Sequence, residues 1–583
     1  MIDFRWFASA LAALFGITPI HSLLHSPLGP ISIVPQPRIV QRYPGSYLWP
    51  KSVSISAATV DERNVAEFLQ AFLRERGLCA RVTTDRNANI VLNSQRLPHG
   101  NEAYELRVGS DRITLSGKGP GLYYALQTLE QVTRSTARGL VSQSVAVTDS
   151  PAYRWRGMQL DVARHFFSVP VVERYIDVAA HYKLNVFQWH LTDEQGWRMP
   201  VAALPRLTAA GPAYTRSEIR DVVAYAKRRY VTIVPEIEMP SHAQAALAAY
   251  PQYGCGAGVI CEDANGLRFA QTVLAEVVRD FPGRYVHVGG DEVRPPFDRA
   301  QPAFTAAVEQ FVESSDRRIA GWDEILTPRL GQRAVVMAWN DLGRAAAAAK
   351  RGNDTVVTAA PLSFDAVQGD ATQEPAGTHH MSTLEEVYDA DVMPGGLGDA
   401  RVYVLGGQAN LWTERIATQS HLFYMALPRE LALAEILWTP RERKSWKSFL
   451  TRLPSQLHWL RERGYAFRMP APIINLSRAR VAFTSVPGRA QSANAWTAGS
   501  TVRVTISEPA AATIRYTLDG TAPSSASAIY RSPFTIALRS NGVADLRVAA
   551  FSSDAASTVS ECMIHRGTQP SRGSQTWNAL VSP

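Results

Sequence analysis

The 583-residue sequence predicts an α/β protein: a (β/α)8 TIM-type barrel with an N-terminal α+β domain and a small C-terminal β-sandwich. Residues 31–150 mix alternating strand patterns with helical ones, and residues 151–470 alternate short apolar runs with longer helical stretches. In residues 476–565 helical periodicity is lost and only strand-like segments remain. We therefore expect three domains, preceded by a signal segment (1–30) and followed by a tail (566–583).

The composition is typical of a folded chain with a large hydrophobic core rather than of a disordered chain. Hydrophobic residues make up 46% and charged residues 19%, enough material for two to four domains. The formal charge of +8 arises from 60 basic and 52 acidic residues that are interspersed, without a Lys/Arg run long enough to follow a phosphate backbone. We therefore expect no nucleic-acid partner, and composition leaves the oligomeric state open.

The N-terminus carries Arg5 and then a mostly apolar stretch, residues 6–20. It is too short to span a bilayer but has the size of a secretory signal core, so we expect export to the periplasm or outside the cell, without a membrane span. Asp3 offsets Arg5, and no clean small-x-small cleavage site follows Ile20, so a buried N-terminal helix is the alternative.

Four cysteines are compatible with an oxidising compartment. Cys255 and Cys261 lie six positions apart in a Gly-rich loop and could close a small disulfide ring, whereas Cys79 and Cys562 fall in different predicted domains. No cluster has the spacing of a metal site, and we expect neither a metal nor another cofactor.

The N-terminal domain begins with a helix signal. Residues 59–62 (TVDE) form a capping box ahead of an amphipathic run that stops at Gly77. Segments 103–108 and 111–117 alternate like a hairpin, and a second helix pattern starts at Gly121.

Eight short apolar runs follow the Asp149-Ser150-Pro151 break. They are residues 156–162, 184–190, 231–237, 285–290, 318–325, 334–340, 354–360 and 401–412. Eight strands in series with intervening helices favour one closed parallel barrel. The alternative, an open doubly wound sheet, would be expected to show a phosphate loop near its first strand, and neither GxGxxG nor GxxxxGK is found.

The C-terminal region contains three clear strand patterns, 501–507, 513–521 and 543–551. They alternate without helical stretches, which is typical of a small β-sandwich.

Residues 284–293 (RYVHVGGDEV) are the most informative segment. A β-branched apolar strand is broken by two glycines, and Asp291 and Glu292 stand where it ends, which is where such a barrel keeps its chemistry. Adjacent acids in one low-dielectric site cannot both ionise easily, so their pKa values are expected to separate. We interpret the pair as a proton donor beside a charged carboxylate; a solvated turn is the structural alternative.

The other strand ends carry polar and aromatic residues that would meet at the same mouth. In order they are Asp161 and Arg164, His190 and Asp193, Glu236 and His242, Trp322 with Asp323 and Glu324, Trp339, Asp365, and Trp412 with Glu414. Indole faces stack on sugar C–H surfaces and charged groups bind hydroxyls, so this set favours a carbohydrate pocket.

The nucleophile stays open at this point. A double-displacement glycosidase needs two carboxyl groups about 5 Å apart on opposite faces of the anomeric carbon. Asp291 and Glu292 arise from one strand end, so either Asp193, Glu236 or Glu324 supplies the opposing carboxylate or the substrate's own 2-acetamido oxygen attacks.

Seven motifs in order resemble those of the family 20 glycoside hydrolases, the β-N-acetylhexosaminidases. They are RGMQLDVARHFF, KLNVFQWHLTDEQGWR, PEIEMPSHA, HVGGDEV, GWDEIL, VMAWN and GQANLWTE. The N-terminal domain is similar to that family's accessory α+β domain, and residues 516–534 resemble the C-terminal β-domain of chitobiase-like members. Seven ordered motifs are far more specific than a lone GGDE.

The resemblance implies a role for each matching residue. Glu292 would protonate the glycosidic oxygen and later activate water, while Asp291 would orient the acetamido group and balance the charge of an oxazolinium intermediate. Asp193 and His242 would lie behind the acid Glu292 and set its pKa and tautomer. The alternative is that they form a buried ion pair with no catalytic part. The implied substrate-binding residues are Arg164, Trp322, Trp339, Asp365, Trp412 and Glu414.

One departure from the family pattern concerns the acetamido group. Where the family usually has Tyr-x-Asp, this chain has Ser363-Phe364-Asp365, and a serine is too short to place the tyrosine hydroxyl on the acetamido oxygen. Losing such a donor typically costs on the order of 10²-fold in rate, unless another hydroxyl is recruited or the acyl preference changes. Glu194, in place of the second Asp of its motif, is a milder change.

The expected function is a retaining exo-β-N-acetylhexosaminidase that removes terminal β-linked GlcNAc or GalNAc from an oligosaccharide or glycoconjugate by substrate-assisted catalysis. One alternative is a non-catalytic or weakly active glycan-binding protein on the same barrel. Another is a conventional two-carboxylate glycosidase acting on sugars that lack an acetamido group.

Overall fold

The computed structural model describes residues 31–477, 479–484, 492–507, 512–539, 542–552 and 556–567. The expected signal segment lies outside the described residues, as does most of the expected tail. Among the described residues, no helix is both long enough and apolar enough to cross a membrane.

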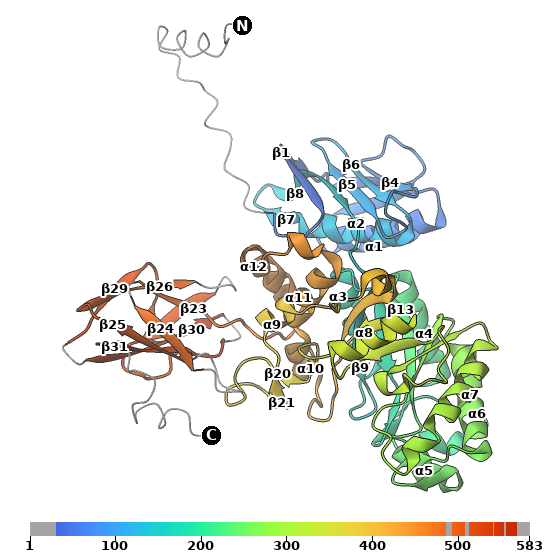
Figure 1. Ribbon diagram of the computed structural model, residues 1–583. Helices are drawn as coiled ribbons and strands as arrows, with labels where there is room; N and C mark the ends of the chain where they lie inside the picture. Colours follow the sequence, from blue (N-terminus) through green and yellow to red (C-terminus); the bar gives the residue numbers. More distant parts are fainter. Residues whose placement is uncertain are drawn as a thin grey trace, which may run out of the picture. The chain divides into compact units, whose positions relative to one another are not determined.

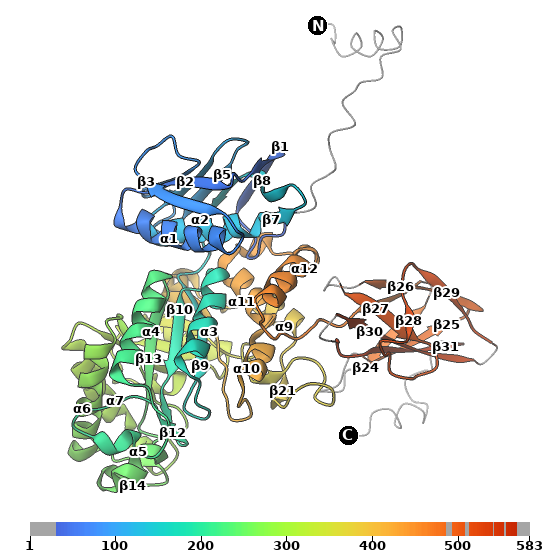
Figure 2. The same cartoon turned by 180° about the vertical axis from the view of Figure 1, so that it is seen from behind.

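The N-terminal domain is an eight-stranded sheet with two helices (Figures 1 and 2). Helices α1 (Val60–Arg74) and α2 (Gly119–Gln131) pack against each other and against the sheet, and α1 starts at the predicted capping box of Thr59 and Glu62. The predicted hairpin is the antiparallel pair β5–β6. The strands are β1 (Ile39–Leu48), β2 (Ser52–Ser56), β3 (Cys79–Thr83), β4 (Ile90–Ser94), β5 (Tyr104–Val108), β6 (Ile113–Gly117), β7 (Thr133–Thr136) and β8 (Gly139–Asp149).

Eight parallel strands close into a barrel in the order β10-β13-β16-β17-β18-β19-β22-β9. This confirms the predicted fold class, since each of the eight apolar runs overlaps one of these strands. They are β9 (Trp155–Asp161), β10 (Val186–His190), β13 (Thr232–Met239), β16 (Tyr285–Gly289), β17 (Arg318–Trp322), β18 (Val335–Ala338), β19 (Asp354–Val357) and β22 (Val404–Ala409).

In two of the predicted strands, part of the apolar run forms 3-10 helix instead. The run from Arg318 turns into 3-10 helix at Asp323–Ile325, because the buried Asp323 carboxylate turns inward and accepts the backbone N–H groups of Trp339 and Asn340 at 3.0 and 3.1 Å. The run from Arg401 likewise begins with 3-10 helix, Gly398–Tyr403, before β22.

Helices surround the barrel and join its strands (Figures 1 and 2). They are α3 (Val169–His181), α4 (Arg216–Arg228), α5 (Gln244–Ala249), α6 (Ala264–Asp280), α7 (Gln301–Glu313), α8 (Leu342–Arg351), α9 (Leu384–Asp389), α10 (Gln419–Ala426), α11 (Arg429–Trp438) and α12 (Trp446–Glu462). Short pairs β11–β12, β14–β15 and β20–β21 decorate the loops, at Thr192–Asp193 with Gly196–Trp197, Gly254–Gly256 with Val259–Ile260, and Ala366–Val367 with Thr378–Met381.

The C-terminal domain is a sandwich of a three-stranded and a six-stranded sheet around one apolar core. Val502 and Val504 of the smaller sheet pack in that core with Leu546, Val548 and Ile564 of the larger one, as the prediction requires. The strands are β23 (Ile473–Ser477), β24 (Arg480–Thr484), β25 (Ser492–Thr497), β26 (Thr501–Ser507), β27 (Thr513–Thr517), β28 (Ala528–Ile529), β29 (Phe534–Ala537), β30 (Val543–Phe551) and β31 (Ser560–Arg566).

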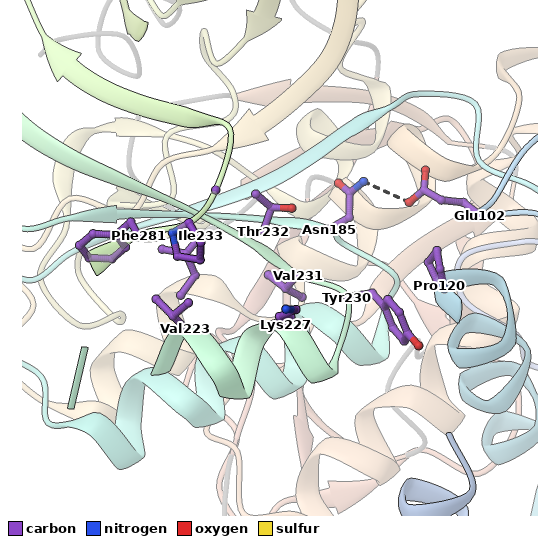
Figure 3. A pocket seen from close by; sticks show the side chains of 12 residues that line it. Glu102, Pro120, Asn185, Val223, Lys227, Tyr230, Val231, Thr232, Ile233 and Phe281 are labelled. Carbon is purple, nitrogen blue, oxygen red and sulfur yellow. Dashed lines mark hydrogen bonds between the residues drawn. The ribbon is translucent and has the colours of Figure 1, made fainter. Parts of the chain in front are cut away.

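A pocket of about 440 Å³ opens at the amino end of the barrel, where β10, β13 and β16 begin (Figure 3). Glu102 lies on its wall, and its Oε1 accepts hydrogen bonds from Arg156 at 2.6 Å and from Asn185 at 3.1 Å. Oε2 accepts a second bond from the Arg156 guanidinium at 3.2 Å. The Glu102 carboxylate on this wall is therefore paired within the protein.

Candidate active site

A pocket of about 180 Å³ lies at the opposite end, where the carboxyl ends of the strands meet. Most of the site residues expected from the sequence line it. Its walls are Arg164, His190, Asp193, Glu238, His242, Asp291, Glu292, Trp322, Trp339, Thr358, Ser363, Asn410, Trp412 and Glu414. The barrel brings these side chains together from sequence positions more than 240 residues apart.

Asp291 and Glu292 follow β16 through a left-handed turn. Gly289 and Gly290 have φ of 65° and 95°, and Glu292 itself has φ of 52°, a conformation that a residue with a Cβ adopts only where its surroundings hold it. A Cβ on Gly289 would overlap the carboxylate of Glu238, so glycine is required there. The turn leaves the Asp291 side chain 16% exposed and that of Glu292 44% exposed, both on the pocket wall.

The acid that interacts most strongly with Asp291 is Glu238, which comes from the neighbouring strand β13. Burial, and then the charge of Asp291, raises the pKa of Glu238 well above its usual value. Burial also raises the pKa of Asp291, but the hydrogen bond with Glu238 and the charge of His242 oppose that rise. We therefore assign the proton of this pair to Glu238 and the negative charge to Asp291, at neutral pH. Glu238 is therefore a further acid beside Asp291, in addition to the Glu292 expected from the sequence.

His242 links Glu292 to Asp193. Its Nε2 lies 3.3 Å from Glu292 Oε2, and its Nδ1 lies 3.3 Å from Asp193 Oδ1. Burial alone would lower the pKa of His242, but the hydrogen bond with Asp193 and the charges of Asp291 and Asp193 raise it to about 9. At neutral pH a cation therefore lies between the two carboxylates, next to the expected proton donor.

The ion pairs continue beneath the pocket. His190 lies between Asp193, 2.9 Å from Nε2, and Glu236, 2.7 Å from Nδ1, while Glu236 also lies 2.9 Å from His287. Burial opposes a charge on His190, but Glu236 and Asp193 together raise its pKa to about 10. Glu236 is fully buried and committed to these two rings. Glu236 is therefore excluded as a protein nucleophile, which leaves Asp193 and Glu324 of the three candidates.

Asp193 is committed in the same way. Besides both histidines, its carboxylate lies 2.9 Å from the Arg164 guanidinium, and its pKa is held well below the usual range. Burial opposes that ionisation, but the hydrogen bonds with His190 and His242 outweigh it. Glu324, the third candidate nucleophile, accepts the indole N–H of Trp339 at 3.1 Å and does not line the pocket.

Arg164 and three tryptophans also line the pocket. The guanidinium lies 5.1 Å from the ring centre of Trp412 and 3.7 Å from Glu414. The rings of Trp412 and the fully buried Trp322 are 5.7 Å apart, and Trp339 is 37% exposed at the rim. An arginine and a carboxylate beside three indoles suit hydroxyl groups on one side and C–H surfaces on the other.

Asp365 is the one expected binding residue that does not line the pocket. It is only 8% exposed, and burial together with the charge of Glu414 raises its pKa to about 6. The position expected to carry tyrosine does line the pocket, as Ser363, whose segment forms a β-bridge with Asn410.

Sequence reasoning missed Glu238, Thr358 and Asn410. Glu238 follows Glu236 by two positions, so strand periodicity already places both on one face of β13. Thr358 and Asn410 carry no such signal, because each is a neutral polar residue at the end of an apolar run.

His190, Glu236 and Glu238 place three potential metal-ligand atoms within 4.8 Å of one another. The donor set does not fit a metal ion. The raised pKa of His190 keeps both ring nitrogens protonated, and a protonated imidazole cannot act as a ligand. Glu236 is already neutralised by the same ring at 2.7 Å.

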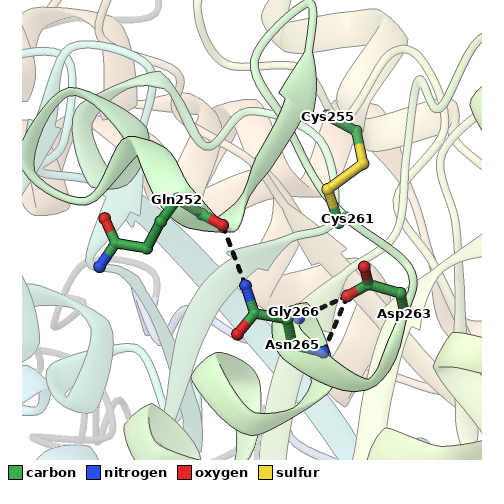
Figure 4. Close-up of a disulfide and its surroundings, with 6 residues drawn as sticks. All are labelled: Gln252, Cys255, Cys261, Asp263, Asn265 and Gly266. Atoms are coloured by element: carbon green, nitrogen blue, oxygen red, sulfur yellow. Dashed lines mark hydrogen bonds between the residues drawn. A yellow bond between two sulfur atoms is a disulfide. The ribbon is translucent and has the colours of Figure 1, made fainter.

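The Cys255–Cys261 pair forms the expected disulfide (Figure 4). It closes the hairpin β14–β15, which holds the His242 backbone from both sides: Ile260 N–H donates to the Pro240 carbonyl at 2.8 Å, and Ala243 N–H donates to the Gly258 carbonyl at 3.0 Å. His242 has φ of 51°, so this hairpin supports an unfavourable backbone conformation at a pocket residue.

Three family models match the chain. The model "Glycosyl hydrolase family 20, catalytic domain" matches residues 153–298 and 294–441, and "Glycosyl hydrolase family 20, domain 2" matches residues 30–150. The "Chitobiase/beta-hexosaminidase C-terminal domain" matches residues 493–561.

Individual relatives agree with these matches. A beta-hexosaminidase of Porphyromonas gingivalis is 32% identical over 570 residues, covering 87% of this chain and 71% of the relative. The structure of a Streptomyces plicatus N-acetyl-beta-hexosaminidase in complex with Thio-NAglucal is 30% identical with a TM-score of 0.72, covering 75% of this chain and 97% of that one. A Vibrio harveyi exo beta-N-acetylglucosaminidase in complex with N-acetylglucosamine is 28% identical with a TM-score of 0.71, covering 76% and 78%. The chain therefore belongs to glycosyl hydrolase family 20, the β-N-acetylhexosaminidases, and is a glycoside hydrolase of the hexosaminidase type.

Proposed function

We propose that this enzyme is a retaining exo-hydrolase that removes terminal β-linked GlcNAc or GalNAc, with the substrate's 2-acetamido oxygen as nucleophile. The observation that carries the proposal is the arrangement of the carboxylates at the mouth. Asp291 and Glu292 lie together on the pocket wall, while the carboxylates of Asp193 and Glu236 are taken up in ion pairs. Neither Asp193 nor Glu236 is therefore free to attack the opposite face of the anomeric carbon, and the substrate's acetamido oxygen takes that role.

In the first step, the acetamido oxygen forms a bond to the anomeric carbon as the bond from that carbon to the leaving oxygen breaks. The carboxyl proton of Glu292 moves to the leaving oxygen, so the alcohol departs neutral. Asp291 accepts the acetamido N–H and balances the positive charge that develops on the oxazolinium ring.

In the second step, water attacks the same carbon and gives up a proton to Glu292, and the acetamido group reforms. Two inversions at one carbon retain the β-configuration. His242 lies 3.3 Å from Glu292, where its positive charge stabilises the carboxylate that exists between the two steps.

Sugar recognition follows the division of the pocket. Arg164 and Glu414 bind ring hydroxyls, and Trp322, Trp339 and Trp412 surround the terminal sugar. We keep Asp365 as a hydroxyl-binding candidate, because its buried Oδ1 has no hydrogen-bond partner among the described residues.

The test is hydrolysis of 4-nitrophenyl β-N-acetylglucosaminide and β-N-acetylgalactosaminide, with ¹H NMR of the first product formed. We expect the β-anomer first, together with inhibition by a thiazoline mimic of the cyclised intermediate. The α-anomer first, or hydrolysis of plain β-glucosides without thiazoline inhibition, would contradict the mechanism. Binding without hydrolysis at any pH would favour the glycan-binding alternative, with Glu292→Gln as the inactive reference.

We also propose that the protein is exported. The apolar stretch of residues 6–20 and the Cys255–Cys261 disulfide both support this location. N-terminal sequencing of the protein from fractionated cells tests it. A processed chain in the periplasm or medium is expected, and an unprocessed chain in the cytosol would contradict it.

A further inference from the structure

One buried hydroxyl at the pocket has no use in the mechanism so far. Thr358 follows β19, lines the pocket and is 1% exposed. Its backbone is fixed, since its N–H donates to the Ala338 carbonyl at 2.8 Å, but its Oγ1 has no hydrogen-bond partner among the described residues. Because Thr358 also lines the pocket, a bound substrate is placed to supply the missing partner.

A second unpaired donor lies in the same part of the pocket. Trp322 is 1% exposed, and its indole Nε1 has no hydrogen-bond partner among the described residues. The ring is held by His287 at 4.7 Å and by Trp412 at 5.7 Å between ring centres, so it cannot easily turn to find one.

The surroundings of Thr358 define what it can bind. The pocket side chains that come from the ends of β17, β18 and β19, namely Trp322, Trp339, Thr358 and Ser363, carry no formal charge. In the barrel order, β17 is the next strand after β16, which places Asp291 at the edge of this uncharged region. The region therefore offers an acceptor for N–H, two indole walls and a hydroxyl donor, in that order around the mouth.

An N-acyl group carries the matching set of an N–H, an apolar end and a carbonyl oxygen. We propose that Thr358 Oγ1 donates a hydrogen bond to the carbonyl oxygen of the substrate's 2-acylamino group. This inference rests on the proposed function and names a further catalytic residue for it. A carbonyl oxygen has two lone pairs, so one accepts from Thr358 while the other faces the anomeric carbon. The hydrogen bond holds the oxygen in line for attack and takes the place of the donor that Ser363 is too short to supply.

The decisive variant is Thr358→Val, which keeps the shape and removes only the hydroxyl. We expect its kcat/KM on 4-nitrophenyl β-N-acetylglucosaminide to fall by on the order of 30-fold, as for loss of one donor at a reacting oxygen. Thr358→Ser, which restores the hydroxyl, should recover most of that loss. Thermal unfolding of both variants checks that they are folded.

Substrates with mono-, di- and trifluoroacetyl groups separate hydrogen bonding from packing. Fluorine makes the carbonyl oxygen a poorer acceptor, so the ratio of parent to Thr358→Val should shrink from about 30-fold with acetyl to a few-fold with trifluoroacetyl. An equal loss across the series would mean that Thr358 only packs, and would overturn the inference.

Ser363→Ala is the matched control, since it removes the other hydroxyl among the pocket-lining residues. We expect a change of less than threefold, roughly the effect of a group that makes no direct bond to the substrate. An acetyl-selective loss in Ser363→Ala, with none in Thr358→Val, would overturn the assignment to Thr358. A parent enzyme whose kcat/KM is indifferent to acyl fluorination would instead contradict the proposed function itself, so the two failures are distinguishable.

Discussion

The two ends of the barrel both carry pockets, and the smaller one is the candidate active site. The amino-end pocket measures about 440 Å³ and the mouth pocket about 180 Å³. On the wall of the larger, Glu102 is fully paired with Arg156, Asn185 and Tyr124. Its charge is therefore balanced within the fold.

At the mouth the reverse holds. Asp291 Oδ1, Thr358 Oγ1, Trp322 Nε1 and Arg164 Nε are buried atoms without hydrogen-bond partners among the described residues, and all four residues line the pocket. Leaving buried polar atoms unpaired costs free energy, which a bound ligand with matching groups returns. Of these two pockets, the smaller one is the one whose lining residues carry unpaired buried polar atoms among the described residues.

The largest expected effect comes from neutralising a carboxylate at the mouth, with a carboxylate at the amino end as the control. Glu292→Gln should lower kcat/KM on an aryl N-acetylglucosaminide with a poor leaving group by on the order of 10³-fold, because the proton donor is lost. Its matched control, Glu102→Gln, removes the carboxylate that pairs with the buried Arg156. That variant should keep kcat/KM within a few-fold but unfold at a clearly lower temperature, since a buried cation loses its partner. Equal losses of activity in both variants would erase the distinction between the two ends.

The next effect tests which member of the Asp291–Glu238 pair carries the charge. Asp291→Asn should cost about 10²-fold in kcat/KM on N-acetyl substrates, because the charge facing the oxazolinium is lost. Glu238→Gln imitates a protonated acid and should cost less than about tenfold at neutral pH.

The same two variants separate further with pH. The raised pKa of Glu238 means that the parent loses activity at alkaline pH, when a second negative charge forms beside Asp291, and Glu238→Gln should keep its activity to higher pH. A greater loss in Glu238→Gln than in Asp291→Asn at neutral pH would show that the charge had been assigned to the wrong residue.

A smaller effect concerns stability rather than rate. His242 has a folded-state pKa of about 9 against an ordinary value of 6.5. Because folding raises this pKa, protonated His242 stabilises the folded state in full below pH 6.5, the pKa in the unfolded chain. That contribution is lost as the pH rises to about 9, the pKa in the folded protein. We expect the free energy of unfolding to fall over this window by on the order of 3 kcal/mol, and by less in His242→Gln. Parallel stability curves for the two proteins from pH 6 to 10 would rule this out.

The smallest effect is that of the disulfide hairpin. Replacing both Cys255 and Cys261 by serine loosens the segment that holds His242, and we expect kcat to fall by about two- to fivefold. Cys79→Ser, at an exposed cysteine in the N-terminal domain, is the control and should change nothing. Unchanged kcat in the double variant would mean that the backbone bonds to Pro240 and Ala243 suffice without the disulfide.

The sequence predicts the architecture well because strand runs and helix caps are local. Every barrel strand overlaps a predicted apolar run, and Thr59 caps α1 where its capping box predicts. The lengths of β17 and β22 were overestimated, since an apolar run cannot reveal where a side chain such as Asp323 turns inward to accept distant backbone N–H groups.

The site was predicted less completely, for a related reason. Motif matches bring Asp291, Glu292 and the tryptophans to one pocket, but the pairing of Asp291 with Glu238 depends on the register of β13 against β16, where Met239 lies opposite Gly289. Whether Thr358 is unpaired depends on what surrounds it in three dimensions. Neither property is encoded in a local pattern.

The most direct test of acetamido participation is the dependence of kcat/KM on acyl basicity in the parent enzyme. With 4-nitrophenyl glycosides bearing acetyl, fluoroacetyl, difluoroacetyl and trifluoroacetyl groups, we expect kcat/KM to fall steeply at each step, because each fluorine weakens the attacking oxygen. Values that stay level across the four substrates would show that the acyl oxygen is not the nucleophile, and the mechanism assigned to Asp291 and Glu292 would be wrong.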